Sequence, residues 1–89
     1  ISFDIYHMFH ELSQIFQPLA EEKGLYLRFK KNSDLPEMIV SDETKIRQIF
    51  FHLIGNAIKF TEHGSVDVNV RVSTDGDRKL LYGSVKDTG

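Results

Sequence analysis

Apolar residues recur at helical spacing near the start of the chain. A stripe with steps of three and four residues runs to about Lys23, which predicts an amphipathic helix. Asp4 can cap its first turn, and Gly24 can end it. Pro18 lies well inside the stripe, so we expect a kink or a local break, because proline lacks an amide donor and crowds the preceding turn. The stripe consists of Ile5, Met8, Phe9, Leu12, Phe16, Leu19 and Ala20.

Alternating apolar and polar positions predict strands elsewhere. Residues 25–31 alternate, and residues 38–40 predict a short strand that pairs with this predecessor after a mostly irregular loop. Residues 65–73 alternate most clearly, which predicts one buried face and one wet face. A turn containing Asp75 and Gly76 then leads to a partner strand over residues 80–86. The inward positions of the two alternating strands are Leu25, Leu27, Phe29, Val66, Val68, Val70 and Val72.

Residues 42–61 predict a second helix with two faces. Asp42 is its expected N-cap, and Glu43 suits the positive end of the helix dipole in the first turn. An apolar stripe predicts the buried face and consists of Ile46, Ile49, Phe50, Leu53, Ile54 and Ala57. A polar row lies on another side and consists of Lys45, Gln48, His52, Asn56, Lys59 and His63.

The order of these elements predicts the fold class. Two helices and a mostly antiparallel sheet favour a two-layer α/β sandwich, an α+β arrangement with both helices on one face of the sheet. The chain has 89 residues, enough for one domain. It begins at Ile1 without a methionine, so we interpret residues 1–89 as part of a longer protein.

Composition narrows the function classes. The net charge of −2 gives no electrostatic case for binding nucleic acid or for direct contact with an anionic membrane. The absence of cysteine excludes a disulfide framework, a zinc ribbon and a thiol nucleophile. No apolar run approaches the roughly 20 residues that a bilayer span requires. We therefore expect a cytoplasmic domain, whose parent protein can still be anchored in a membrane by segments elsewhere.

The polar row of the second helix offers candidate chemistry. Asn56 and Lys59 lie one turn apart and point the same way. An amide oxygen can ligate a hard cation and an ammonium group can meet a phosphate, so this pair suggests a site for a magnesium nucleotide. Spacing alone does not decide the matter, because any surface helix can place these two residue types one turn apart.

Two motifs resemble those of a known family. The segment His52-Leu53-Ile54-Gly55-Asn56-Ala57-Ile58-Lys59-Phe60-Thr61 resembles the N box of sensor histidine kinases, and the terminal Val85-Lys86-Asp87-Thr88-Gly89 resembles the Asp-x-Gly of their G1 box. The motifs occur in the family's order with a strand pair between them. The resemblance implies the nucleotide-binding domain of a sensor histidine kinase, hybrid kinases included, with the Bergerat fold truncated after the G1 motif.

The resemblance also implies roles for individual residues. Asn56 would ligate the Mg²⁺ ion that bridges the phosphates of ATP, and Lys59 would reach those phosphates. Asp87 would accept a hydrogen bond from the exocyclic amine of adenine, and Gly89 would allow close approach of the backbone to the base. Phe60 stands where many relatives have tyrosine, and it cannot donate a hydrogen bond.

His52 and Gly83 depart from the family pattern. Relatives most often have asparagine at position 52, and related ATPases of the gyrase type have a glutamate base there. An imidazole can act as a base near neutral pH, although we favour a tolerated substitution beside the site. The absence of glutamate argues against dedicated ATP hydrolysis. Gly83 replaces a large apolar residue within a strand, which indicates a void or a close approach.

The resemblance implies an activity for the parent protein. It would bind ATP and Mg²⁺ and transfer the γ-phosphate to a histidine, from which the phosphate passes to a response-regulator receiver domain. Its partners would be the dimerising phosphoacceptor helices and that receiver domain, within a homodimer. This chain alone should bind nucleotide weakly or not at all. The alternative is a degenerate, non-catalytic module that regulates a partner kinase by contact, and an ATPase of the gyrase type is a third possibility.

Overall fold

The computed structural model of the chain describes residues 2–31, 38–40, 42–76 and 78–87. Its elements follow one another as β1 (Ser2–Asp4), α1 (Ile5–Glu22), β2 (Tyr26–Lys31), β3 (Met38–Val40), α2 (Glu43–Phe60), β4 (Ser65–Asp75) and β5 (Arg78–Asp87). The loop predicted between residues 32 and 41 and the glycine at position 89 fall outside the described residues, apart from the short strand β3.

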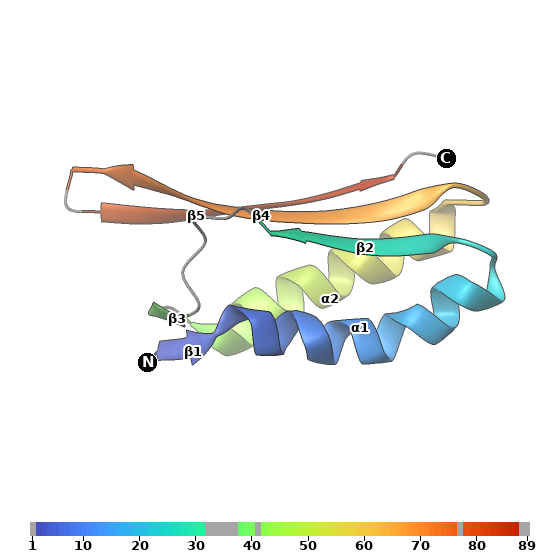
Figure 1. Ribbon diagram of the computed structural model, residues 1–89, viewed down its shortest axis with the longest axis horizontal. Helices are drawn as coiled ribbons and strands as arrows, with labels where there is room; N and C mark the ends of the chain where they lie inside the picture. Colours follow the sequence, from blue (N-terminus) through green and yellow to red (C-terminus); the bar gives the residue numbers. More distant parts are fainter. Residues whose placement is uncertain (1, 32–37, 41, 77, 88–89) are drawn as a thin grey trace.

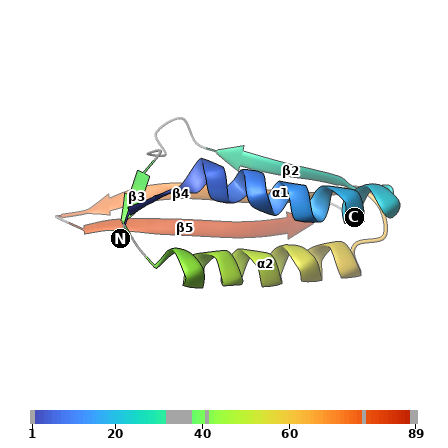
Figure 2. The ribbon, with the colours of Figure 1, turned by 90° about the horizontal axis from the view of Figure 1, so that it is seen from below.

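The molecule has two layers (Figure 1). The strands β2, β4 and β5 form one sheet, and both helices lie side by side against one face of it, as Figure 2 also shows. The short strands β1 and β3 pair at the end of the molecule where both helices begin. This arrangement confirms the predicted two-layer α/β sandwich with both helices on one face.

Strand pairing differs from the sequence expectation in two respects. The strand β3 pairs with β1 and not with β2, because the three residues Ser2–Asp4 supply it with an antiparallel partner. The strand β2 instead pairs in parallel with β4, while β4 and β5 form the expected antiparallel hairpin. The two strands run parallel because α2, which precedes β4 in the sequence, returns the chain to the end of the sheet where β2 begins. The three-stranded sheet is thus mixed, but its longer pairing, β4 with β5, is antiparallel, so most of the pairing is antiparallel as predicted.

The helix α1 begins and ends as its sequence predicts. The Asp4 carboxylate accepts hydrogen bonds from the backbone N–H groups of Tyr6 and His7, at 2.9 and 3.2 Å. Gly24 has a φ of 73°, and the N–H of Leu25 donates to the carbonyl of Ala20, which forms a Schellman cap. The cap brings Leu25 into the core at the start of the sheet.

The helix α1 passes through Pro18 without the predicted break. It remains helical to Glu22, and the buried residues Phe16 and Ala20 lie on either side of the proline. Pro18 itself is exposed. Water can therefore hydrogen-bond the carbonyl that loses its amide partner, which lowers the cost of a proline inside the helix.

The core lies between the helices and the sheet. The helix α1 contributes the largest share, and the inward positions of β2 and β4 close it from the other side, as the alternation predicts. The side chain of Val72 lies outside the described residues. The core residues are Phe3, Ile5, Met8, Phe9, Leu12, Phe16, Ala20, Leu25, Leu27, Phe50, Ile54, Ile58, Val66, Val68 and Val70.

Asp67, on the outer face of the sheet, is less exposed than the alternation predicts. Asp67 alternates with the inward valines of β4, yet only 7 % of its surface is exposed. Its carboxylate forms an ion pair with Lys30 at 3.3 Å. Lys86 of β5 and Arg28 of β2 stand opposite Asp67 in the two flanking strands, so basic residues surround this acid.

The helix α2 buries a narrower face than its apolar stripe predicts. Phe50, Ile54 and Ile58 are buried, but Ile49 and Leu53 are 51 % and 41 % exposed. The prediction that both belong to the buried face is therefore wrong. The buried direction of α2 is centred on Ile54, with Phe50 and Ile58 one turn to either side of it. Ile49 and Leu53 lie further around the helix, on the side that faces Gly83 of β5.

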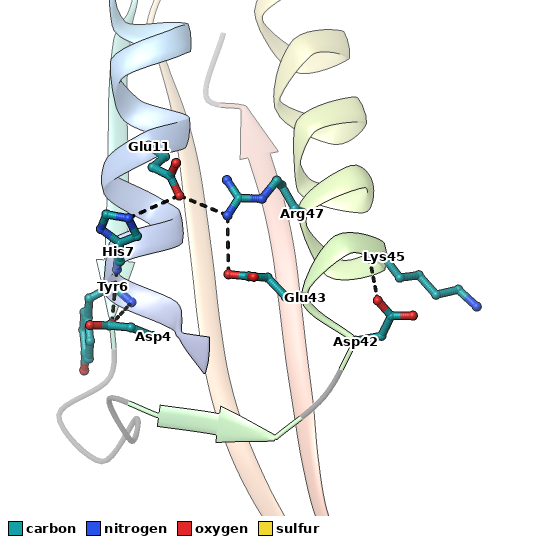
Figure 3. Close-up of polar contacts among 8 residues, drawn as sticks. All are labelled: Asp4, Tyr6, His7, Glu11, Asp42, Glu43, Lys45 and Arg47. Atoms are coloured by element: carbon teal, nitrogen blue, oxygen red, sulfur yellow. Dashed lines mark hydrogen bonds and ion pairs between the residues drawn. The ribbon is translucent and has the colours of Figure 1, made fainter. Parts of the chain in front are cut away.

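Polar contacts join the two helices near their starts (Figure 3). The Arg47 guanidinium contacts the carboxylate of Glu11 on α1 at 3.0 Å and that of Glu43, one turn earlier on α2, at 3.4 Å. His7 lies 3.5 Å from the same Glu11 carboxylate. All these side chains are at least one-third exposed, so each pair contributes at most about 1 kcal/mol to stability.

Candidate functional site

Asn56 and Lys59 lie in the last two turns of α2, as predicted. Both side chains are exposed. The Lys59 ammonium lies 5.3 Å from the centre of the Phe60 ring, and that ring is itself 73 % exposed. The amide and the ammonium group are therefore both accessible at the surface. His52 is exposed one turn before Asn56 on the same helix.

Asp87 lies at the end of β5, close to the end of α2. It stands opposite Val66 in the hairpin, and β4 begins at Ser65, shortly after α2 ends at Phe60. Figures 1 and 2 both show the end of β5 and the end of α2 at the same end of the molecule. Asp87 is exposed.

Asp87 belongs to the face of the sheet that meets the helices. Side chains of a strand alternate between its two faces, so positions 83, 85 and 87 share one face. A Cβ atom at Gly83 would meet the Phe50 ring of α2, and Val85 packs against the core. Asp87 therefore continues a row that faces α2.

A corresponding row runs along α2. Ile49, Leu53 and Asn56 follow one another at steps of four and three residues, which places them on one side of the helix. Both rows run toward the end where α2 finishes. The structure thus brings the sides that carry Asn56 and Asp87 to the same end of the molecule.

A hollow of about 130 Å³ lies between α2 and β5, earlier along both rows. Its lining is almost entirely apolar and consists of Ile46, Ile49, Phe50, Leu53 and Gly83. The Phe50 ring lies directly over Gly83, where an added Cβ would come within 2.6 Å of its Cζ atom. The close approach predicted for Gly83 is therefore present, and a hollow accompanies it.

One contact at the end of α2 is not predicted by the sequence. The Lys23 side chain, from the cap of α1, donates to the backbone carbonyls of Ile58 and Lys59 at 2.6 and 3.0 Å. A lysine directly before a helix-ending glycine gives no sign of which distant carbonyl it reaches. Only the packing of the two helices brings these groups together.

The comparisons with known proteins place the chain among signalling kinases. No family model matches the chain. The aerobic respiration control sensor protein ArcB of Escherichia coli K12 is 41 % identical over 70 residues, which are 79 % of this chain and 9 % of ArcB. The autoinducer 2 sensor kinase/phosphatase LuxQ of Vibrio cholerae is 38 % identical over 88 % of this chain and 9 % of its own length.

A third relative spans the whole chain. The signal transduction histidine-protein kinase BarA of Escherichia coli K12 is 32 % identical over 100 % of this chain and 10 % of its own. The chain belongs to the sensor histidine kinases. It corresponds to about a tenth of the length of these curated relatives.

Solved structures agree with this assignment to the sensor histidine kinases. The crystal structure of full-length ShkA in complex with AMPPNP matches with a TM-score of 0.85 and 37 % identity, over 100 % of this chain and 18 % of that one. The catalytic domain of the histidine kinase ThkA has the same fold, with a TM-score of 0.68 at 18 % identity, over 98 % of this chain and 58 % of that one.

The matches confirm the resemblance to sensor histidine kinases that the two motifs indicated. In the part of the chain that the structure describes, no helix combines the length and the apolar character needed to cross a membrane.

Proposed function

We propose that this chain is the N-terminal portion of the ATP-binding domain of a sensor histidine kinase, within a longer protein. The observation that carries the proposal is the alignment of two rows, Ile49–Leu53–Asn56 on α2 and Gly83–Val85–Asp87 on β5, toward one end of the molecule. The rows thereby bring an amide and a carboxylate to one end of the molecule, and the Lys59 ammonium group lies one turn beyond the amide on α2.

These groups fit the parts of a magnesium nucleotide. The exposed Asn56 carboxamide offers an oxygen of the kind that Mg²⁺ takes beside phosphate oxygens. Lys59 presents a positive charge one turn further on, where it would meet the phosphates. Asp87 can accept a hydrogen bond from the amine of adenine, which would select adenine over guanine. Gly89 is proposed to admit the base, and it lies beyond the described residues.

The bound ATP would supply the phosphoryl group, and the protein would hold it in place. Catalysis of phosphoryl transfer depends mainly on positioning and on fixed charge around the phosphates. We propose that the acceptor is a histidine on dimerising helices of the same homodimeric parent, and that the phosphate then passes to a receiver-domain aspartate. His52 is not assigned a catalytic role. The complex of ShkA with AMPPNP supports an adenine nucleotide as the ligand class.

Two substitutions in the full-length protein test this proposal. Asn56→Ala and Asp87→Asn should each weaken the binding of AMPPNP with Mg²⁺ at least about tenfold, as lost contacts to charged groups do, and should abolish autophosphorylation. Isothermal titration and phosphate incorporation from labelled ATP measure the two effects. Gln48→Ala is the matched control, because Gln48 is exposed two turns earlier on α2 and should change neither quantity. Normal phosphate incorporation in either site variant would refute the role of that residue.

The same assays address the regulatory alternative, which the histidine at position 52 favours. A non-catalytic module would incorporate no phosphate in the unmodified full-length protein, and it would act by contact with a partner kinase. Nucleotide binding without phosphate incorporation would therefore favour that alternative, whereas both activities together would exclude it.

A further inference from the structure

The end of α2 is held by a residue from another element. An α-helix leaves its last four carbonyl groups without partners inside the helix. At the end of α2, the N–H of Thr61 satisfies Ala57, and the Lys23 ammonium reaches Ile58 and Lys59. The side chain of Lys23 thus covers two consecutive carbonyls that the helix cannot satisfy by itself.

Lys23 is well placed to hold this turn still. Its backbone lies in the Schellman cap of α1, where its own N–H donates to Ala20 at 3.1 Å. A second contact joins the same regions, because the N–H of Tyr26 donates to the carbonyl of Gly64 at 3.1 Å. The ammonium also carries a positive charge at the negative end of the α2 dipole.

The turn that Lys23 holds carries one residue of the proposed site and adjoins the turn that carries another. One of the two carbonyls belongs to Lys59 itself, and Asn56 lies one turn earlier. Fraying of the last turn would move the Lys59 backbone first and would loosen the turn that carries the Asn56 amide. A site that depends on fixed charges loses affinity when those charges gain freedom, because binding must then also order them.

We propose that Lys23 is a positioning residue for the nucleotide site, holding the last turn of α2 so that Asn56 and Lys59 keep a fixed geometry. The role in binding rests on the proposed function, whereas the restraint on the helix end does not. Lys23 touches no nucleotide in this scheme.

The test compares three variants of the full-length protein. Lys23→Met keeps the length and apolar stem of the side chain but removes the donor, and it should weaken AMPPNP–Mg²⁺ binding about tenfold, because binding must then also order the last turn of α2. Lys23→Arg keeps a cationic donor and should recover most of the affinity. Lys45→Met is the matched control with the same change of charge, because the Lys45 side chain points away from the other labelled residues at the opposite end of α2 (Figure 3). It should change the affinity less than twofold.

Amide hydrogen exchange separates positioning from a general loss of stability. In Lys23→Met without nucleotide, we expect faster exchange at the amides of residues 58–61 and unchanged exchange in the middle of α2. Uniformly faster exchange along the helix, or weaker nucleotide binding with unchanged exchange at its end, would overturn the positioning role. If the unmodified protein binds no AMPPNP, the proposed function fails, and the exchange result still decides whether Lys23 restrains the helix end.

Discussion

The two helices have the same length but different relations to the rest of the molecule. The helix α1 buries Ile5, Met8, Phe9, Leu12, Phe16 and Ala20, whereas α2 buries only Phe50, Ile54 and Ile58. The helix α1 packs against β2, whereas α2 packs against β4 and β5. The helix α2 leaves a row of apolar side chains beside the hollow next to β5, and its end carries the candidate site. The comparison shows that α1 mainly builds the core, whereas α2 buries fewer side chains and leaves the side that carries the candidate site open to solvent.

The largest expected difference between the helices is in the effect of the same leucine-to-alanine substitution on each of them. Leu12→Ala should lower the free energy of unfolding by about 3 kcal/mol, because Leu12 on α1 is fully buried and its removal leaves a cavity. Leu53→Ala on α2 should cost about 1 kcal/mol or less, since that side chain is 41 % exposed. Urea unfolding followed by circular dichroism measures both. Equal losses would mean that other parts of the protein cover Leu53 and that the contrast between the helices is smaller than this structure indicates.

Two glycine substitutions test how closely α2 packs against its neighbours, one at Gly83 on β5 and one at Gly55 on α2. Gly83→Ala should destabilise the protein by about 1–3 kcal/mol, because the new Cβ would come within 2.6 Å of the Phe50 ring. Gly55→Ala is the control on α2 itself, where the added Cβ would meet Phe16 at an ordinary 3.7 Å. Alanine favours a helix over glycine, so Gly55→Ala should stabilise the protein by about 0.5–1 kcal/mol.

Thermal unfolding of the two glycine variants and of the double variant Gly83→Ala/Phe50→Leu checks these signs. The smaller leucine should restore part of the stability lost in Gly83→Ala, because it withdraws the ring from the new methyl group. A neutral Gly83→Ala would show that the ring moves freely and that the hollow beside β5 is not tightly defined.

The smallest expected difference concerns the helix starts. Asp4→Ala removes a carboxylate that accepts from two backbone N–H groups of α1, and Asp42→Ala removes one that accepts from a single N–H group of α2, that of Lys45 at 3.1 Å. Each should cost about 1 kcal/mol of unfolding free energy, with the larger loss for Asp4. Urea titration of the two variants side by side measures the order, and a larger loss for Asp42 would reverse this part of the comparison.

Much of the fold follows from local pattern. Helical spacing and caps located both helices within a residue or two, since Asp4, Gly24 and Asp42 act through neighbours in the sequence. Strict alternation located the inward side of β4. The two motifs indicated the family, which the relatives confirm. The roles of Asn56, Lys59, Asp87 and Gly89 remain predictions that the proposed experiments test.

The sequence by itself determined which segments form helices and strands and which residue types could meet a nucleotide, because these depend on contacts between near neighbours. Only the tertiary structure decided that β3 pairs with β1, that β2 runs parallel to β4, and that Ile49 and Leu53 stay exposed. It alone brought Lys23 to the carbonyls of Ile58 and Lys59. Such contacts depend on which surfaces remain available after the helices pack on the sheet. The spacing of residues within one segment does not determine this, because the partners are distant in the sequence.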